Sequence, residues 1–294
     1  QRVGRGVVMN AVSSHVDNLP QRRYVFVLRN HSSCDPDREC PMAVEPLAHL
    51  DTGGDSPAIV FIHGMTFSKQ TWDPIVDRLR DRFRCLAIDL PGHGGSTGSG
   101  ADPRAVVARI HATVLANAVV RPVVVGHSAG ALHATAYAAA HATAGALNVD
   151  QPLRVGAFAA FVQQLAPALR GPDFVSAFAP FAASIGVGRL PEPERGRVLA
   201  TQRIDQQLVL DHWDKVLTES PADLQAEIDA LLDRVTVPYL WLAAGPVDAA
   251  DRDHLLTHVP QAQIETWSNL GHMAHLAEPD PFAARVSQFA IDAG

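Results

Sequence analysis

The sequence predicts an α/β fold, in which helices cover both faces of a mostly parallel central sheet. Ala58–Ile62 is a short, wholly apolar run of β-forming residues, and Val123–Val125 and Ala146–Val149 are further short runs that are expected to be buried strands. Such runs are typical of strands that a parallel sheet buries on both sides. Segments with helical periodicity separate them, and this alternation with short links indicates parallel strands joined by right-handed crossovers.

The other elements follow the same rhythm along the chain. Trp72, Ile75 and Leu79 share one helical face, and Asp102 followed by Pro103 is a typical helix start. Further strands are expected at Pro46–Leu50, Cys85–Asp89, Tyr239–Ala243 and Ile264–Trp267. Helices are expected at Trp72–Arg80 and Pro103–Leu115, after Gly130 to about Thr143, near Leu224–Leu232 and Arg252–His258, and from about Pro281.

One interval interrupts the alternation. Residues 151–221 carry five phenylalanines among Gly and Pro breaks. We expect a helical cap there, inserted between two parts of one core, residues 42–150 and 222–294. Residues 1–41 show little periodicity and are expected to be an N-terminal extension that is accessory or poorly ordered.

Composition excludes several classes of protein. Hydrophobic residues make up 47% of the 294 residues and charged residues 19%, which excludes a disordered or coiled-coil chain. The net charge of 24 − 31 = −7 argues against a nucleic-acid binder that works by bulk positive charge. No apolar run approaches the roughly 20 residues that span a bilayer.

The three cysteines bound the compartment and the metal chemistry. Cys34, Cys40 and Cys85 leave at least one free thiol, which together with the acidic charge favours a cytoplasmic protein. Neither a second cysteine pair nor a His-x-x-x-His run lies near Cys34 and Cys40, so no zinc site is expected there. We expect neither a metal nor a cofactor.

The strongest chemical signal is Gly126-His127-Ser128-Ala129-Gly130, which stands between an apolar strand and a helix. This is a G-x-S-x-G nucleophile elbow in the strand–turn–helix context that the motif requires. Larger side chains at the glycines would clash in so tight a turn, which presents the Ser128 hydroxyl above the sheet. The alternative interpretation is a small-residue turn with an idle serine.

Two further signals supply what a nucleophilic serine needs. Two amides must face the developing oxyanion, and the expected donors are Ala129 and, in the loop after the strand Ala58–Ile62, Met65. A neighbouring imidazole must take the proton of the serine. His272, on a loop before the last helix, is the candidate, and His275 is interpreted as packing support.

Together these motifs resemble the α/β-hydrolase superfamily. They are His63-Gly64, Asp89-Leu90-Pro91-Gly92-His93-Gly94-Gly95-Ser96, Gly126–Gly130 and Gly271-His272, in the order and spacing of that family. The resemblance implies that Ser128 is the nucleophile, that His272 is the base, and that residues 151–221 form a cap over the pocket. It implies a structural loop, without a catalytic role, for Asp89–Ser96.

The resemblance leaves two candidates for the acid of the triad. Family members usually place it after the strand that corresponds to Tyr239–Ala243, where Gly245-Pro246-Val247-Asp248 fits the Gly-x-x-Asp spacing. Other members take it from the strand after the nucleophile helix, and Asp150 stands at the carboxyl end of that strand, where α/β active sites form. We favour Asp248 slightly and retain Asp150.

The expected function is cleavage of a carboxylic ester or lactone of a small, largely apolar substrate through an acyl-enzyme on Ser128. The phenylalanines of the expected cap favour an apolar substrate. A thioesterase or acyltransferase would use the same residues. A cofactor-free oxygenase or perhydrolase and a non-catalytic small-molecule binder are alternatives from other classes. A small molecule is the only expected partner, with neither nucleic acid nor membrane, and the oligomeric state stays open.

Overall fold

The computed structural model describes residues 44–294, so the expectation for residues 1–41 lies outside the described residues. Seven strands within residues 44–294 form one sheet, in the order β1-β3-β2-β4-β5-β6-β7. Their bounds are β1 His49–Asp51, β2 Ala58–Ile62, β3 Arg84–Ile88, β4 Val123–His127, β5 Gly145–Val149, β6 Tyr239–Ala243 and β7 Ala262–Thr266. Only β1 runs antiparallel to its neighbour, and every other pair is parallel.

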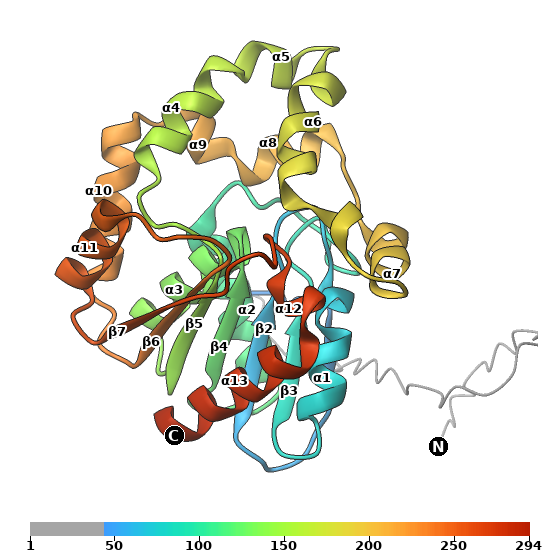
Figure 1. The fold of residues 1–294 in the computed structure, drawn as a ribbon, viewed down its shortest axis with the longest axis vertical. Coiled ribbons are helices and arrows are strands. Elements are labelled where there is room, and N and C mark those ends of the chain that lie inside the picture. The colour runs from blue at the N-terminus through green and yellow to red at the C-terminus, as the bar shows by residue number, and fades with distance from the viewer. Residues whose placement is uncertain (1–43) are drawn as a thin grey trace, which may run out of the picture. The chain divides into compact units, whose positions relative to one another are not determined.

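Helices cover both faces of this sheet (Figure 1). Helices α2 and α3 enclose one apolar cluster against the sheet, and α1 and α13 enclose another on the opposite face. The bounds of the core helices are α1 Asp73–Leu79, α2 Pro103–Ala116, α3 Ala129–Ala140, α11 Ala249–His258, α12 Ala274–Ala277 and α13 Pro279–Ala293, with a 3-10 turn η1 at Lys69–Trp72. The predicted fold class is therefore confirmed.

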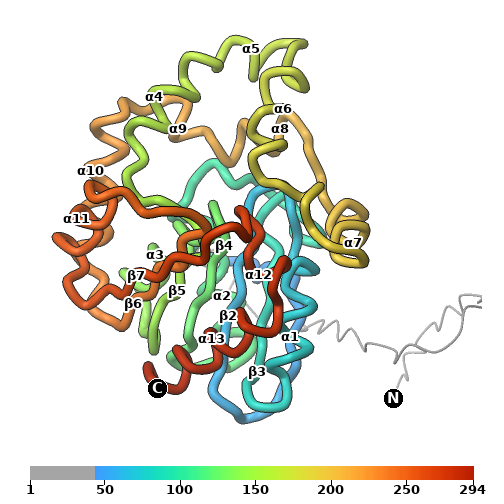
Figure 2. The backbone as a smooth tube through the Cα atoms, in the orientation of Figure 1, coloured from blue at the N-terminus to red at the C-terminus, as the bar shows by residue number. Residues whose placement is uncertain are grey.

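The segment between β5 and β6 is helical and arches over one end of the sheet (Figures 1 and 2). It consists of α4 Gly156–Gln164, α5 Ala166–Arg170, α6 Phe174–Ile185, η2 Val187–Arg189, α7 Glu194–Thr201, α8 Gln206–His212, α9 Asp214–Thr218 and α10 Pro221–Leu232. We call α4–α9 the cap. Its own apolar cluster is built around Phe174, Phe178 and Trp213. Helix α10 contacts both α4 of the cap and α3 of the core.

His275 is a fully buried histidine with no hydrogen-bond partner for either ring nitrogen among the described residues. Its ring packs against Trp72, with ring centroids 4.7 Å apart. Burial lowers the pKa of His275 from 6.5 to about 3, so the imidazole is neutral in the folded protein. Because a buried polar group without a partner costs free energy, this side chain is a local weak point of the core.

We expect His275→Phe to reduce the loss of stability in acid. Below pH 6.5 the unfolded chain protonates this imidazole, whereas the folded chain does so only near pH 3, so stability falls as the pH drops through that window. Between pH 7 and pH 5 the unfolding free energy of the variant, which lacks the His275 imidazole, should therefore fall by about 1–2 kcal/mol less than that of the wild type. Urea unfolding at both pH values measures this, and His275→Leu controls for overpacking by the larger ring. Equal losses in the wild type and both variants would contradict the prediction.

Candidate active site

Ser128 occupies the tight turn between β4 and α3, with φ 53° and ψ −129°. A positive φ in a residue other than glycine is strained, and such strain concentrates at functional sites. The Ser128 amide donates to the Val149 carbonyl at 2.9 Å, which fixes the turn to the end of β5. A Cβ on Gly126 would lie 2.2 Å from the Gly130 oxygen, and one on Gly130 would lie 2.4 Å from the His63 oxygen. The turn therefore requires glycine at both positions.

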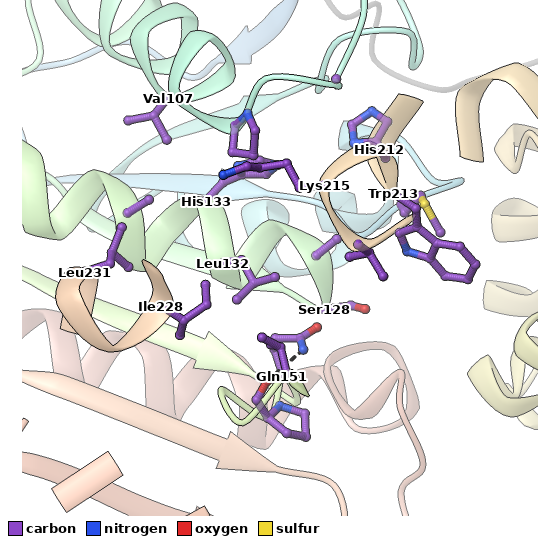
Figure 3. A pocket seen from close by; sticks show the side chains of 18 of the residues that line it. Val107, Ser128, Leu132, His133, Gln151, His212, Trp213, Lys215, Ile228 and Leu231 are labelled. Atoms are coloured by element: carbon purple, nitrogen blue, oxygen red, sulfur yellow. Dashed lines mark hydrogen bonds between the residues drawn. The ribbon is translucent and has the colours of Figure 1, made fainter. Parts of the chain in front are cut away.

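Ser128 opens onto a cavity of about 1660 Å³ between the core and the cap (Figure 3). Asp150, His272, Ala129 and Met65 line the same cavity. These residues come from the ends of β4 and β5, from the loop after β2 and from the loop after β7. The carboxyl ends of neighbouring parallel strands thus bring together five of the six residues that the sequence analysis selected.

His272 is held by a carboxylate. Its Nδ1 lies 2.7 Å from Asp150 Oδ2, and because an ionised carboxylate only accepts hydrogen bonds, Nδ1 is the donor. The other oxygen, Asp150 Oδ1, accepts from the Ala244 amide at 2.7 Å. Asp150 has a φ of 56°, and its amide donates to the Leu242 carbonyl at 2.8 Å, so both backbone and side chain are anchored. A neutral His272 then keeps Nε2 free to accept a proton.

Asp248, which the sequence analysis favoured, points elsewhere. It is exposed and is the N-cap of α11, where its Oδ1 accepts from the amides of Ala250 at 2.6 Å and Asp251 at 3.2 Å. Aspartate is among the preferred N-cap residues because its carboxylate satisfies amides that the helix leaves without partners. Asp150, and not Asp248, is therefore the carboxylate that contacts His272 in this structure.

The two expected oxyanion donors are both available. Ala129 is the first residue of α3, and the amide of that position has no partner within its own helix. In the loop after β2, Phe67 donates to the Gly64 carbonyl at 3.2 Å and Thr66 donates to His93 Nε2 at 3.0 Å. Among the described residues this leaves the Met65 amide without a hydrogen-bond partner. The two amides are thus free to donate to a ligand in the cavity.

Two buried histidines support the loop that carries Met65. His63 Nδ1 donates to the Gly64 carbonyl at 2.8 Å, and its Nε2 accepts from the Leu90 amide at 3.0 Å. His93 Nδ1 donates to the Pro91 carbonyl at 2.9 Å, while its Nε2 holds Thr66, which has a φ of 72°. Burial lowers the pKa of His63 to about 3 and that of His93 to about 2. Both rings therefore stay neutral and act as paired donor and acceptor.

A third buried histidine supports the loop of His272. His127, directly before Ser128, donates from Nε2 to the His272 carbonyl at 2.8 Å. The centroids of the two rings are 4.7 Å apart. His127 therefore links the turn that holds Ser128 to the loop that holds His272. Sequence reasoning missed this role, although the position of His127 inside the G-x-S-x-G motif was available as a signal.

The rest of the cavity wall is mainly apolar and comes from the cap and from α3 and α10. Trp213 sits among three phenylalanines, with ring centroids 4.9 Å from Phe181, 5.6 Å from Phe178 and 5.7 Å from Phe158. On the opposite wall Leu132, Ile228 and Leu231 face the same space (Figure 3). In this view Ser128 lies between Trp213 and Gln151.

A family comparison identifies this arrangement. The model of the alpha/beta hydrolase family matches residues 59–285. The chain belongs to this family. The match includes the Ser128 turn, Asp150 and the loop of His272.

The sequence identity of this alpha/beta hydrolase to two curated relatives is below 30%. It is 26% identical over 265 residues to the pimeloyl-[acyl-carrier protein] methyl ester esterase of Nitrosomonas europaea. The aligned region covers 80% of this chain and 96% of that relative. It is 28% identical over 249 residues to the 2-succinyl-6-hydroxy-2,4-cyclohexadiene-1-carboxylate synthase of Yersinia pseudotuberculosis, with 79% and 87% covered. The structure of a hydrolase from Pseudomonas aeruginosa PA01 superposes with a TM-score of 0.67 at 19% identity, covering 83% of this chain and 93% of that one, which shows a shared fold.

Proposed function

We propose that this alpha/beta hydrolase is a serine hydrolase that cleaves a carboxylic ester or lactone with a small, largely apolar acyl or alcohol group. The observation that carries the proposal is the strained Ser128, which shares one cavity with a His272 that donates to Asp150 at 2.7 Å. The similarity to an esterase supports the same reaction class.

The proposed reaction proceeds through an acyl-enzyme. Ser128 Oγ attacks the acyl carbonyl while His272 Nε2 takes the hydroxyl proton, and the Met65 and Ala129 amides stabilise the oxyanion. The tetrahedral intermediate collapses, the C–O bond breaks, and the alcohol leaves with the proton from His272. Water then gives a proton to His272 and attacks the acyl group, which releases the acid and restores Ser128. Asp150 holds the tautomer in which Nε2 accepts.

Two of the four Lys and Arg side chains that line the cavity are paired with acidic residues, whereas Arg104 and Arg234 have no carboxylate partner among the described residues. Lys215 lines the cavity but is paired with Glu219 at 3.0 Å and with Glu227. Arg154, also in the wall, pairs with Asp251 at 3.3 Å. A substrate carboxylate would have to compete with these acidic partners for Lys215 and Arg154, and the mainly apolar wall around Ser128 favours an uncharged group there. The volume exceeds the roughly 300–1,000 Å³ of common ligand pockets, so both halves of an ester have room.

A second candidate follows from the similarity to a synthase. In that case the same pocket would serve a synthase reaction instead of ester cleavage. The two candidates differ in one measurable outcome, because only hydrolysis releases one equivalent of acid from each ester.

A matched ester panel tests the proposed function. We expect the full chain to release acid from butyrate esters and from simple lactones, and to hydrolyse the hemisuccinate ester of the same alcohol at least about tenfold more slowly. Acid release is followed at constant pH, with thioesters as a further arm. If the chain turns over none of these compounds, the proposal is overturned. A preference for the hemisuccinate ester would overturn the assignment of an uncharged substrate.

A further inference from the structure

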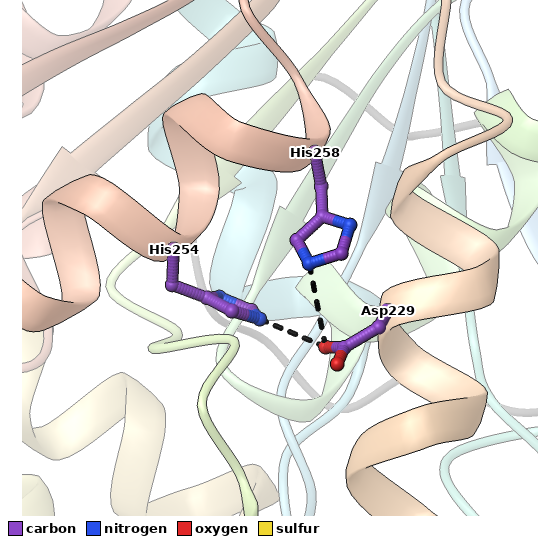
Figure 4. Close-up of side chains that lie close together, drawn as sticks. All are labelled: Asp229, His254 and His258. Atoms are coloured by element: carbon purple, nitrogen blue, oxygen red, sulfur yellow. Dashed lines mark hydrogen bonds and ion pairs between the residues drawn. The ribbon is translucent and has the colours of Figure 1, made fainter.

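A second group of potential ligand side chains lies outside the catalytic cavity, between α10 and α11. Asp229 projects from α10, and His254 and His258 project from α11 toward it (Figure 4). One ligand atom from each residue lies within 4.8 Å of the others. We propose that these three side chains form a site for a divalent transition-metal ion, with Zn²⁺ as the ion that suits it best.

The spacing of the three residues is what such a site needs. His254 and His258 are four apart on one helix, which places them on the same face. His254 Nε2 lies 2.8 Å and His258 Nε2 lies 4.0 Å from Asp229 Oδ1. A tetrahedral ion with ligands at 2.0–2.2 Å separates its ligand atoms by roughly 3.4 Å, between these two values. Small rotations of the side chains would therefore seat the ion.

The surrounding side chains supply the support that metal ligands require. His258 Nδ1 donates to Asp233 Oδ1 at 2.7 Å, which turns Nε2 of the same ring toward Asp229. Ligating histidines almost always donate their other ring nitrogen in this way, often to a carboxylate. This contact is independent of the clustering of the three ligand atoms.

The carboxylate of Asp229 is oriented as well. Gln225 Oε1 accepts from the Val155 amide at 2.7 Å, which fixes the amide group so that Nε2 faces Asp229. Gln225 Nε2 then donates to Asp229 Oδ1 at 2.7 Å. Asp229 and both histidines are partly exposed, with side-chain accessibilities of 33%, 16% and 20%, so an ion has a route from solvent.

The donor set selects the class of metal. Imidazole nitrogens suit Zn²⁺ and other late first-row ions, whereas Mg²⁺ and Ca²⁺ prefer sites made of oxygen ligands. Two nitrogens and one carboxylate oxygen leave a fourth position for water. The His254-x-x-x-His258 pair lies far along the chain from Cys34 and Cys40, and only Asp229, from another helix, completes a set of three ligands.

The site would join helix α10, which forms part of the wall of the catalytic cavity, to helix α11. Helix α10 carries Ile228 and Leu231 on the cavity wall (Figure 3), while Asp229 faces α11. Helix α11 follows the loop in which the Ala244 amide holds Asp150. A bound ion would therefore clamp the pocket wall onto the segment that positions the triad carboxylate, and its binding should raise the melting temperature.

Zinc titration of the full chain, freed of any affinity tag and stripped with a chelator, tests the proposal. We expect one Zn²⁺ per chain, displaced by neither Mg²⁺ nor Ca²⁺, and visible Co²⁺ absorption of a tetrahedral site. Asp229→Asn, His254→Gln and His258→Gln should each weaken binding more than about tenfold. The supporting variant Asp233→Asn should weaken it by about 10- to 100-fold.

The matched control is Asp253→Asn, which removes the same charge from an exposed position of α11 outside the cluster. It should bind Zn²⁺ as the wild type does. Circular dichroism of the metal-free variants checks that each is folded, and the binding readout is independent of ester hydrolysis. Zinc binding that is equally tight in the wild type and in the combined Asp229→Asn/His254→Gln/His258→Gln variant would overturn the proposal, as would an absence of one-to-one binding.

Discussion

Ser128→Ala is expected to abolish covalent labelling by a fluorophosphonate probe and to lower kcat by about 10⁵-fold or more. The reason is that Ser128 occupies the strained turn between β4 and α3 and lines the same cavity as His272. The residual rate should still exceed that of the uncatalysed reaction, because the Met65 and Ala129 amides and the pocket remain in place.

The matched control for this variant is Ser184→Ala. Ser184 lines the same cavity, but it lies on the cap helix α6 and donates to the Phe181 carbonyl at 2.8 Å. Its removal should leave labelling and kcat within a factor of about two. Labelling that persists in Ser128→Ala would move the nucleophile to another residue, and no labelling of the wild type would contradict the serine hydrolase.

The parts of the fold that the sequence predicted are those where burial decides the pattern. The strands Ala58–Ile62 and Tyr239–Ala243 have the predicted bounds, because every residue of these runs but Ala58 is buried. Asp102 also caps α2 as expected, by accepting from the Arg104 amide. At β7 the expected Ile264–Trp267 is displaced from the observed Ala262–Thr266. This strand forms an exposed edge of the sheet, where apolar periodicity is weak.

The residues of the site were predictable where a local motif fixes them and ambiguous where only the fold does. Ser128 sits inside a five-residue turn whose backbone the glycines dictate. The carboxylate partner of His272, Asp150, directly follows β5 and lies 122 residues away in the sequence, so only the tertiary structure selects it. Asp248 has the same chemistry and a plausible spacing, but the start of α11 already uses its carboxylate. Helix capping and catalysis both favour aspartate after a strand, and the sequence alone does not separate them.

Asp150→Asn is expected to lower kcat by about 10⁴-fold, whereas Asp248→Asn should change it by less than about twofold. In the Asp150→Asn variant the single carbonyl oxygen of the amide is taken by the Ala244 amide, which now donates to Oδ1 at 2.7 Å. The NH₂ group then faces His272 Nδ1 and donates to it, so the imidazole proton moves to Nε2. That tautomer has no acceptor for the proton of Ser128.

Asp248→Asn keeps a good N-cap, so both activity and stability should stay near those of the wild type. Asp248→Ala completes the comparison: it should cost about 1 kcal/mol of unfolding free energy through the lost cap of α11, with kcat again unchanged. Steady-state kinetics and urea unfolding on the three variants separate the two carboxylates, because one should affect turnover and the other only stability. A kcat within tenfold of the wild type in Asp150→Asn, or a loss of several orders of magnitude in Asp248→Asn, would return the acid to Asp248.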